Sequence, residues 1–220
     1  MNFNDFKFKL QRFFRRIHIG GIGAVVCTAD LLLELYSFAI TLFTNQLNSN
    51  NITNIIFLVI NCVFDLYLVR YFLQSKENNN LSFAKLAIIL LVIANYIMPA
   101  ISNAIQGILN SSIGMVLFSI ILSGGILGIV YFVLLVLENK HIGKRNYLIM
   151  AILGGIMFLF GIVQGVLNII MAVETLMMSS DLSTILLFIY TFLSSFVTIG
   201  MGLIFFLFPL FSIREQKRGY

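Results

Sequence analysis

The stretch VVCTADLLLELY, residues 25–36, lies inside a hydrophobic run that extends from about Ile19 to Phe43. A helix needs roughly 20 apolar residues to cross a hydrocarbon core about 30 Å thick, so this run is long enough to span a membrane. Two acidic residues, Asp30 and Glu34, interrupt the run one helical turn apart. The stretch therefore predicts a transmembrane helix that carries carboxylates inside the bilayer.

The composition of the whole chain is typical of an integral membrane protein. Of its 220 residues, 60% are hydrophobic and only 10% are charged, whereas roughly a quarter of the residues in a soluble domain are charged. Long apolar runs recur along the sequence, and it lacks the short alternating segments of a membrane β-barrel. We therefore predict an all-α integral membrane protein, a bundle of six transmembrane helices in three hairpins. The predicted spans are residues 19–44, 53–73, 84–108, 113–137, 147–173 and 183–211.

The basic residues predict the orientation of this bundle. All 14 Lys and Arg residues fall before span one, around the turns after spans two and four, or after span six. The opposite turns, at residues 45–51, 110–112 and 177–181, contain none. Because cytoplasmic loops are enriched in Lys and Arg, we expect both termini in the cytoplasm and a multi-pass protein of the plasma membrane. The net charge of +5 is explained by topology, and we expect no nucleic-acid partner.

The sequence divides into three parts. Residues 1–18 are expected to form a cytoplasmic basic amphipathic segment, residues 19–212 the six-span domain, and residues 213–220 a short basic cytoplasmic tail. Aromatic and aliphatic residues recur at helical spacing in the first part, with cations mostly on the other side, so this segment is suited to lie on anionic lipid. A pure orientation signal and a docking surface for a cytoplasmic partner are the alternatives.

Two similar strings predict an internal repeat. AIQGILN at 104–110 resembles IVQGVLN at 162–168, and each holds Gln and Asn four residues apart on one helical face. Both strings lie in spans that run outward, so they would be parallel copies. Gln106, Gln164 and Asn168 are therefore candidate solute-binding residues toward the outer leaflet.

The acidic residues of the first two spans are the main candidate site. Asp30 and Asp65 lie at similar depths on antiparallel spans, Glu34 follows Asp30 by one turn, and Asn61 precedes Asp65 by one turn. A carboxylate at the middle of a bilayer is costly, so such residues usually face the bundle interior or a watery cavity. We expect these four residues to bind a cation or a small polar solute.

The two cysteines suggest a variant of this site. Each begins a Cys-x-x-Asp string, and antiparallel packing would bring Cys27 to the level of Asp65 and Cys62 to the level of Asp30. Thiolates and carboxylates both bind zinc-like metals, so a divalent cation is one candidate ligand. The alternative is that both cysteines only pack, and that the carboxylates act without a cofactor.

These features favour a transporter of a small solute or cation, or the membrane subunit of a transport complex, with homo-oligomers or complex subunits as partners. A non-catalytic scaffold or assembly partner is the first alternative. An intramembrane aspartyl hydrolase, in which two carboxylates share a proton, is the second. Families with that chemistry carry a G-x-G-D string, whereas each Asp here follows Cys-x-x. We therefore expect no enzyme and assign no catalytic residue.

Overall fold

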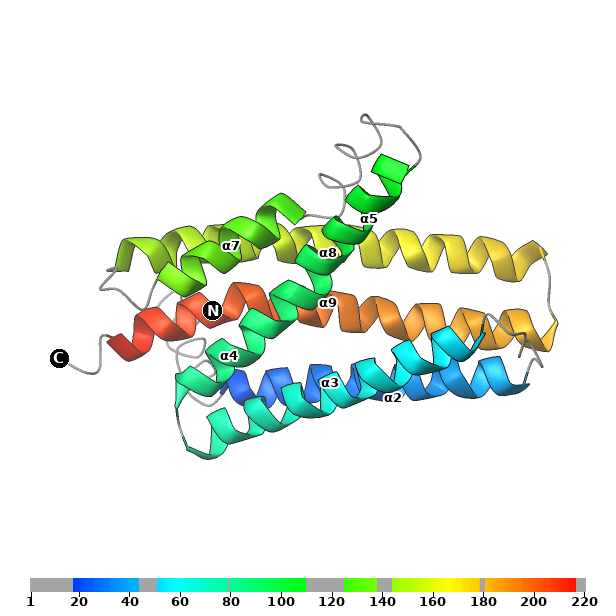
Figure 1. Cartoon of the computed structure of the whole chain (residues 1–220), viewed down its shortest axis with the longest axis horizontal. Coiled ribbons are helices and arrows are strands. Elements are labelled where there is room, and N and C mark those ends of the chain that lie inside the picture. The colour runs from blue at the N-terminus through cyan, green and yellow to red at the C-terminus, as the bar shows by residue number, and fades with distance from the viewer. Residues whose placement is uncertain are drawn as a thin grey trace, which may run out of the picture. The chain divides into compact units, whose positions relative to one another are not determined.

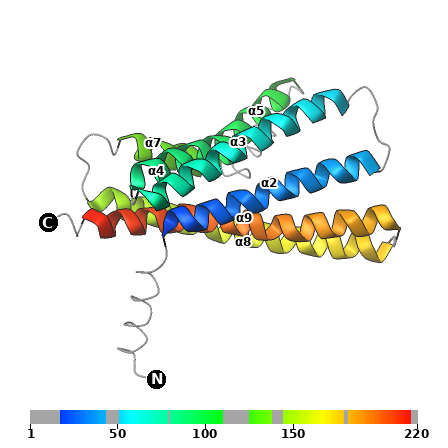
Figure 2. The same cartoon turned by 90° about the horizontal axis from the view of Figure 1, so that it is seen from below.

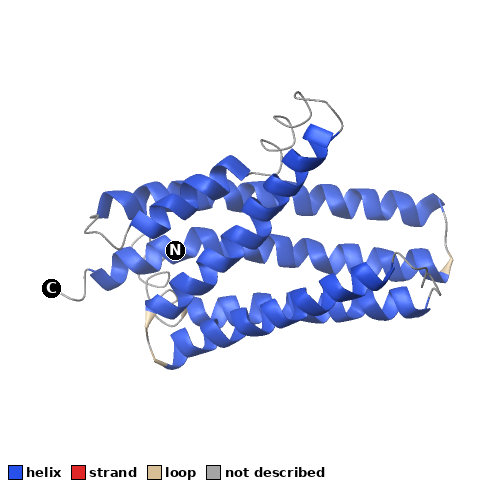
Figure 3. Ribbon diagram, viewed as in Figure 1, coloured by secondary structure: helices blue, strands red, loops and turns tan. Residues whose placement is uncertain are grey.

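The structure of the protein is a computed structural model. It describes residues 18–43, 51–78, 80–109, 125–137, 144–178 and 181–216. Over these ranges the chain is helical and contains no strand (Figure 3). The elements are α2 (Ile19–Phe43), α3 (Asn51–Glu77), α4 (Leu81–Val92), the π-helix η1 (Ile93–Ile97), α5 (Met98–Leu109), α7 (Gly125–Leu137), α8 (Lys144–Met178) and α9 (Leu182–Gln216).

Four helical stretches are long and apolar enough to cross a membrane. They are Ile19–Ile40, Leu81–Ile101, Asn146–Met178 and Leu182–Ile213. Much of their apolar surface is exposed; Val25 and Leu159, for example, are 70% and 62% exposed. Because a helix satisfies all its backbone polar groups internally, such stretches are stable in hydrocarbon. They indicate an integral membrane protein.

The remaining two predicted spans are not among these four. α3 covers the second predicted span, but it is the least hydrophobic of the long helices and carries both Asp65 and Arg70. α7 covers only the end of the fourth predicted span, and residues 110–124 lie outside the described part of the chain. The count of six spans therefore stays a prediction. The amphipathic segment at residues 1–17 and the end of the basic tail at 217–220 also lie outside the described residues.

The chain forms two compact units. The first unit is Met1–Ala84 with Ile170–Val197, and the second is Lys85–Ile169 with Thr198–Tyr220. The long helices α8 and α9 each contribute one part to each unit.

In the first unit, α2 and α3 run antiparallel and side by side (Figures 1 and 2). They approach closely at one end because two small residues of α2 face the backbone and ring of α3. A Cβ atom at Gly20 would collide with the carbonyl of Phe72, and a Cβ atom at Gly23 would collide with its ring. Small residues are the usual means by which membrane helices approach one another. This contact fixes the register of the pair.

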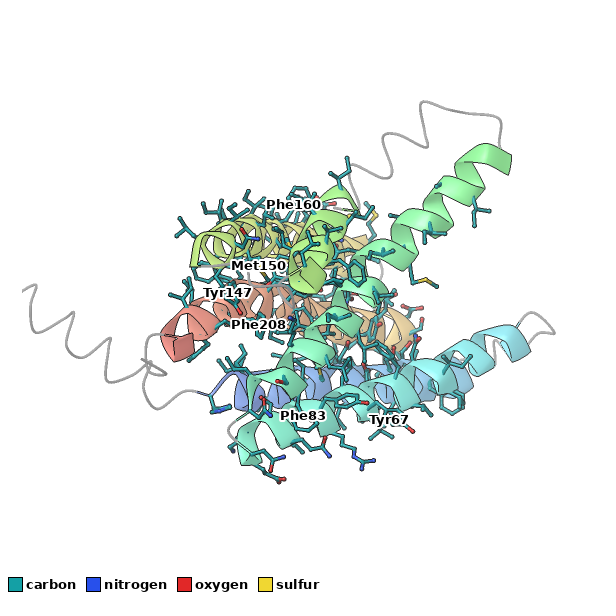
Figure 4. The ribbon with its side chains drawn as sticks, turned by 60° about the vertical axis from the view of Figure 1, so that its left-hand side comes forward. Tyr67, Phe83, Tyr147, Met150, Phe160 and Phe208 are labelled. Atoms are coloured by element: carbon teal, nitrogen blue, oxygen red, sulfur yellow. The ribbon has the colours of Figure 1, made fainter. Side chains whose placement is uncertain are left out.

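In the second unit, α8 and α9 are packed by the same means. A Cβ atom at Gly154 of α8 would collide with the backbone of Phe205 in α9. Next to this contact, the buried side chains of Tyr147, Met150 and Phe208 gather where the two helices meet (Figure 4).

A proline in α9 leaves a backbone carbonyl without its usual helical donor, and a side chain of another helix donates to this carbonyl. In a regular helix the N–H of residue 209 would donate to the carbonyl of Phe205, but Pro209 has no N–H. The hydroxyl of Tyr131 in α7 donates to that carbonyl instead, at 2.7 Å, and the bond is buried. The ring of Tyr96 also lies edge-on to the ring of Phe205, 5.5 Å away. Phe205 thus joins three helical segments of the second unit.

The other proline follows a change of helical pitch. Pro99 is the second residue after η1, and the N–H of Met98 donates to the carbonyl of Ile93, five residues back. A proline ring clashes with the carbonyl four residues before it, and the wider π turn accommodates such a disturbance. α4 and α5 therefore continue one another through η1 as one helical segment (Figure 1).

Candidate functional site

The structure brings the three predicted acidic residues together in the first unit. Asp65 of α3 lies close enough to Asp30 and Glu34 of α2 for their charges to interact, and Glu34 also lies close to Asp30. The antiparallel register set by Gly20 and Gly23 places these groups opposite one another. The acids therefore occupy one shared region rather than opposite faces of the pair.

Glu34 is held by polar side chains of α3. Its Oε2 accepts a hydrogen bond from Sγ of Cys62 at 3.6 Å, and its carboxylate is also hydrogen-bonded by the side chain of Asn61. The sequence predicts that Cys62 lies at the level of Asp30. In the structure Cys62 donates to Glu34 instead, which lies one turn farther along α2. Cys27 lies near Asp65 and Asp30, as its spacing indicates.

Asp65 is the most enclosed of the acids. Its side chain is 5% exposed, and its Oδ2 atom is buried and has no hydrogen-bond partner. Asp30 and Glu34 are half-buried. Within the part of the chain that the structure describes, none of the groups that act on these three carboxyls is basic. The region therefore gathers three acidic groups, and no basic side chain among the described residues balances them.

Tyr190 of α9 belongs to the same region. Its side chain is hydrogen-bonded to that of Ser37 and lies close to Asp30 and Glu34. The neighbouring contact from the hydroxyl of Tyr36 to the carbonyl of Leu186, at 3.3 Å, also joins α2 to α9. Sequence reasoning missed Tyr190, because nothing in the pattern of α9 distinguishes its polar residues from those that face other directions. Only the packing of α9 on α2 selects it.

The metal hypothesis is not supported by a ligand cluster among the described residues. There, no group of three or more His, Cys, Asp and Glu side chains is arranged to hold a metal ion. Both cysteines are free, Cys27 buried and Cys62 half-buried, and the Cys62 thiol is engaged with Glu34. A divalent ion bound by Cys27 and Cys62 stays a prediction.

The predicted amide residues other than Asn61 lie in the second unit. On α8, Gln164 is exposed and Asn168 is half-buried. The side chain of Gln106 lies outside the described part of the structure. A role for these amides in solute binding and the repeat that they suggest therefore stay predictions.

A groove of about 570 Å³ lies on another side of α2, between it and α9. Its lining is apolar, with Val25, Leu32 and Phe196 among the residues. The hydroxyl of Tyr36, which also lines the groove, already donates to a backbone carbonyl. The groove offers little to a polar solute, and the acidic region remains the candidate site.

Comparison with known proteins provides no further assignment. No protein-family model matches the chain, and no curated protein or solved structure is significantly similar to it. Chemically, three neighbouring carboxyls with an amide, two thiols and two hydroxyl groups can neutralise a cation or take up and release protons.

Proposed function

We propose that the protein is a transporter of a small solute or cation, or the membrane subunit of a transport complex, and that Asp30, Glu34 and Asp65 bind its positively charged ligand. The observation that supports this most directly is the buried, unpartnered Oδ2 atom of Asp65 beside two further carboxyls. Acidic residues inside a membrane protein that lack a basic partner are typical of ion and proton pathways.

The alternative of a scaffold has one observation in its favour. The hydrogen bonds from Cys62 and Asn61 to Glu34 join α2 to α3, and buried polar side chains can stabilise helix pairs without any transport role. The unpartnered atom of Asp65 argues against this alternative, because a purely structural carboxyl gains stability only from the bonds it makes.

The orientation and location are part of the same proposal. We place both termini in the cytoplasm and the protein in the plasma membrane, because every Lys and Arg lies on one side of the predicted spans.

Reconstituted protein tests the proposal. Proteoliposomes on a solid-supported membrane would be exposed to Na⁺, K⁺, Mg²⁺, Zn²⁺ and alkylammonium ions while charge movement is recorded. At least one of these ions should give a current in the wild type. Asp65→Asn should reduce the current at least about tenfold, because the amide keeps the volume but not the charge.

Glu174→Gln is the matched control. Glu174 is an exposed carboxylate on the part of α8 in the first unit, so its loss should leave the current unchanged. If the wild type responds to none of these ions, and Asp65→Asn only lowers thermal stability, the scaffold alternative replaces transport.

A further inference from the structure

The acidic region draws polar side chains from three helices. α2 contributes Asp30, Glu34 and Ser37, α3 contributes Asp65, and α9 contributes Tyr190. All of them lie in the first unit. A ligand of this region would therefore contact α9 as well as the α2–α3 pair. Side chains of all three helices then determine which ligands can bind.

The region is elongated. Asp30 and Ser37 are seven residues apart on α2, which corresponds to roughly 10 Å along the helix axis. Among the described residues, no three acidic, thiol or imidazole side chains are grouped around one point as a metal ion requires. A single small ion would thus contact only part of this region, whereas a longer ligand with a charged end would contact both of its ends.

The enclosed end of the region requires a hydrogen-bond donor. The Oδ2 atom of Asp65 is buried and unpartnered, and leaving such an acceptor unsatisfied is costly in a low-dielectric interior. Glu34, in contrast, already accepts bonds from Cys62 and Asn61. Among these carboxyl oxygens, Oδ2 of Asp65 is therefore the one that lacks a donor. A positively charged N–H group would donate to this atom and would also neutralise the charge of the carboxylate.

The other end of the region is aromatic. The hydroxyl group of Tyr190 is hydrogen-bonded to Ser37 and lies close enough to Asp30 and Glu34 to interact with their charges. Aromatic rings next to carboxylates attract organic ammonium ions, since the ring contacts the alkyl part and its face attracts the charge. A bare metal ion gains little from such a ring.

We infer that the acidic region binds a small organic ammonium ion, with its N–H donors on Asp65 and Asp30 and its alkyl part against Tyr190. This inference rests on the proposed function and specifies its ligand class. It also makes Tyr190 a binding residue that is distinct from the three acids.

Binding to the purified full-length protein in nanodiscs tests this inference, by isothermal titration and by thermal unfolding. The probes are butylammonium, the neutral analogue 1-butanol, tetramethylammonium, which lacks N–H donors, and the inorganic ions Na⁺ and Zn²⁺. Butylammonium should bind and raise the unfolding temperature, and 1-butanol should do neither. Tetramethylammonium should bind at least about tenfold more weakly, because it cannot donate to Asp65.

Two substitutions of Tyr190 separate its ring from its hydroxyl group. Tyr190→Leu should weaken butylammonium binding by about three- to thirtyfold, the range expected of a cation–aromatic contact. Tyr190→Phe keeps the ring and should weaken it less. The comparison of probes on the wild-type protein remains decisive if either variant does not fold.

The outcomes distinguish this inference from the proposed function. Binding of Na⁺ or Zn²⁺ but not butylammonium, with loss of that binding in Asp65→Asn, would overturn the organic-cation inference and leave a carboxylate-based transporter. Equal binding of butylammonium and 1-butanol would show that only the alkyl chain is recognised and would also overturn the organic-cation inference. Failure of every cation to bind would remove the proposed function as well.

Discussion

The bond from Tyr131 to the carbonyl of Phe205 predicts a specific coupling between two substitutions. Tyr131→Phe removes the hydroxyl that donates to this buried carbonyl at 2.7 Å and keeps the ring that lies edge-on to Phe205. Because Pro209 has no N–H, α9 itself supplies no replacement donor. Tyr131→Phe should therefore leave a buried acceptor unsatisfied, at a cost of about 1–3 kcal/mol in the free energy of unfolding.

The same change should cost much less when position 209 can donate. In Pro209→Ala the N–H of residue 209 is restored, and the carbonyl of Phe205 regains its regular partner within α9. Tyr131→Phe in this background should lower stability by less than about 0.5 kcal/mol. The interaction energy of the double-mutant cycle should then be about 0.5–3 kcal/mol, which is the range that such cycles measure.

Thermal unfolding of purified protein in one detergent measures the four members of the cycle. For a chain of this length 1 kcal/mol corresponds to roughly 2–4 °C, so Tyr131→Phe alone should lower the unfolding temperature by roughly 2–12 °C. Tyr67→Phe is the control, because Tyr67 is 53% exposed, and its change should be within about 0.5 kcal/mol of zero. If Tyr131→Phe lowers the free energy of unfolding equally with and without Pro209, the proline is not the reason that the carbonyl of Phe205 depends on Tyr131.

Three further predictions concern packing, topology and lipid. Gly154→Ala should destabilise the protein by about 1–3 kcal/mol in thermal unfolding, because the new Cβ collides with the backbone of Phe205. Gly155→Ala is the control and should be near neutral, because its Cβ would lie 3.5 Å from the ring of Phe206. In a cysteine-free background, a membrane-impermeant thiol reagent should label single cysteines from outside at residues 48, 111 and 180, and only after permeabilisation at residues 78, 142 and 218; one reproducible reversal contradicts six spans. A peptide of residues 1–17 should become helical, by circular dichroism, on anionic vesicles far more than on neutral ones, and equal behaviour on both would leave it as an orientation signal.

The sequence by itself determined where the long helices lie and that Asp30 and Asp65 lie at similar levels of neighbouring helices. The predicted spans 19–44, 147–173 and 183–211 correspond closely to α2, α8 and α9, because in hydrocarbon a long apolar run has few alternatives to a helix. An antiparallel hairpin with a short turn then fixes the levels of its residues. For this reason the proximity of Asp30 and Asp65 followed from counting residues.

Only the tertiary structure decided which faces meet. The hydrogen bond from Cys62 to Glu34 and the contacts of Tyr190 with Ser37 and the acids depend on the rotation of each helix about its axis. α2 and α9 carry apolar side chains of their own on nearly every face, so hydrophobic periodicity does not identify the face that points inward. In a membrane that rotation is set by close packing, as at Gly20 and Gly23 against Phe72, and such contacts join residues far apart in the chain that no local pattern connects.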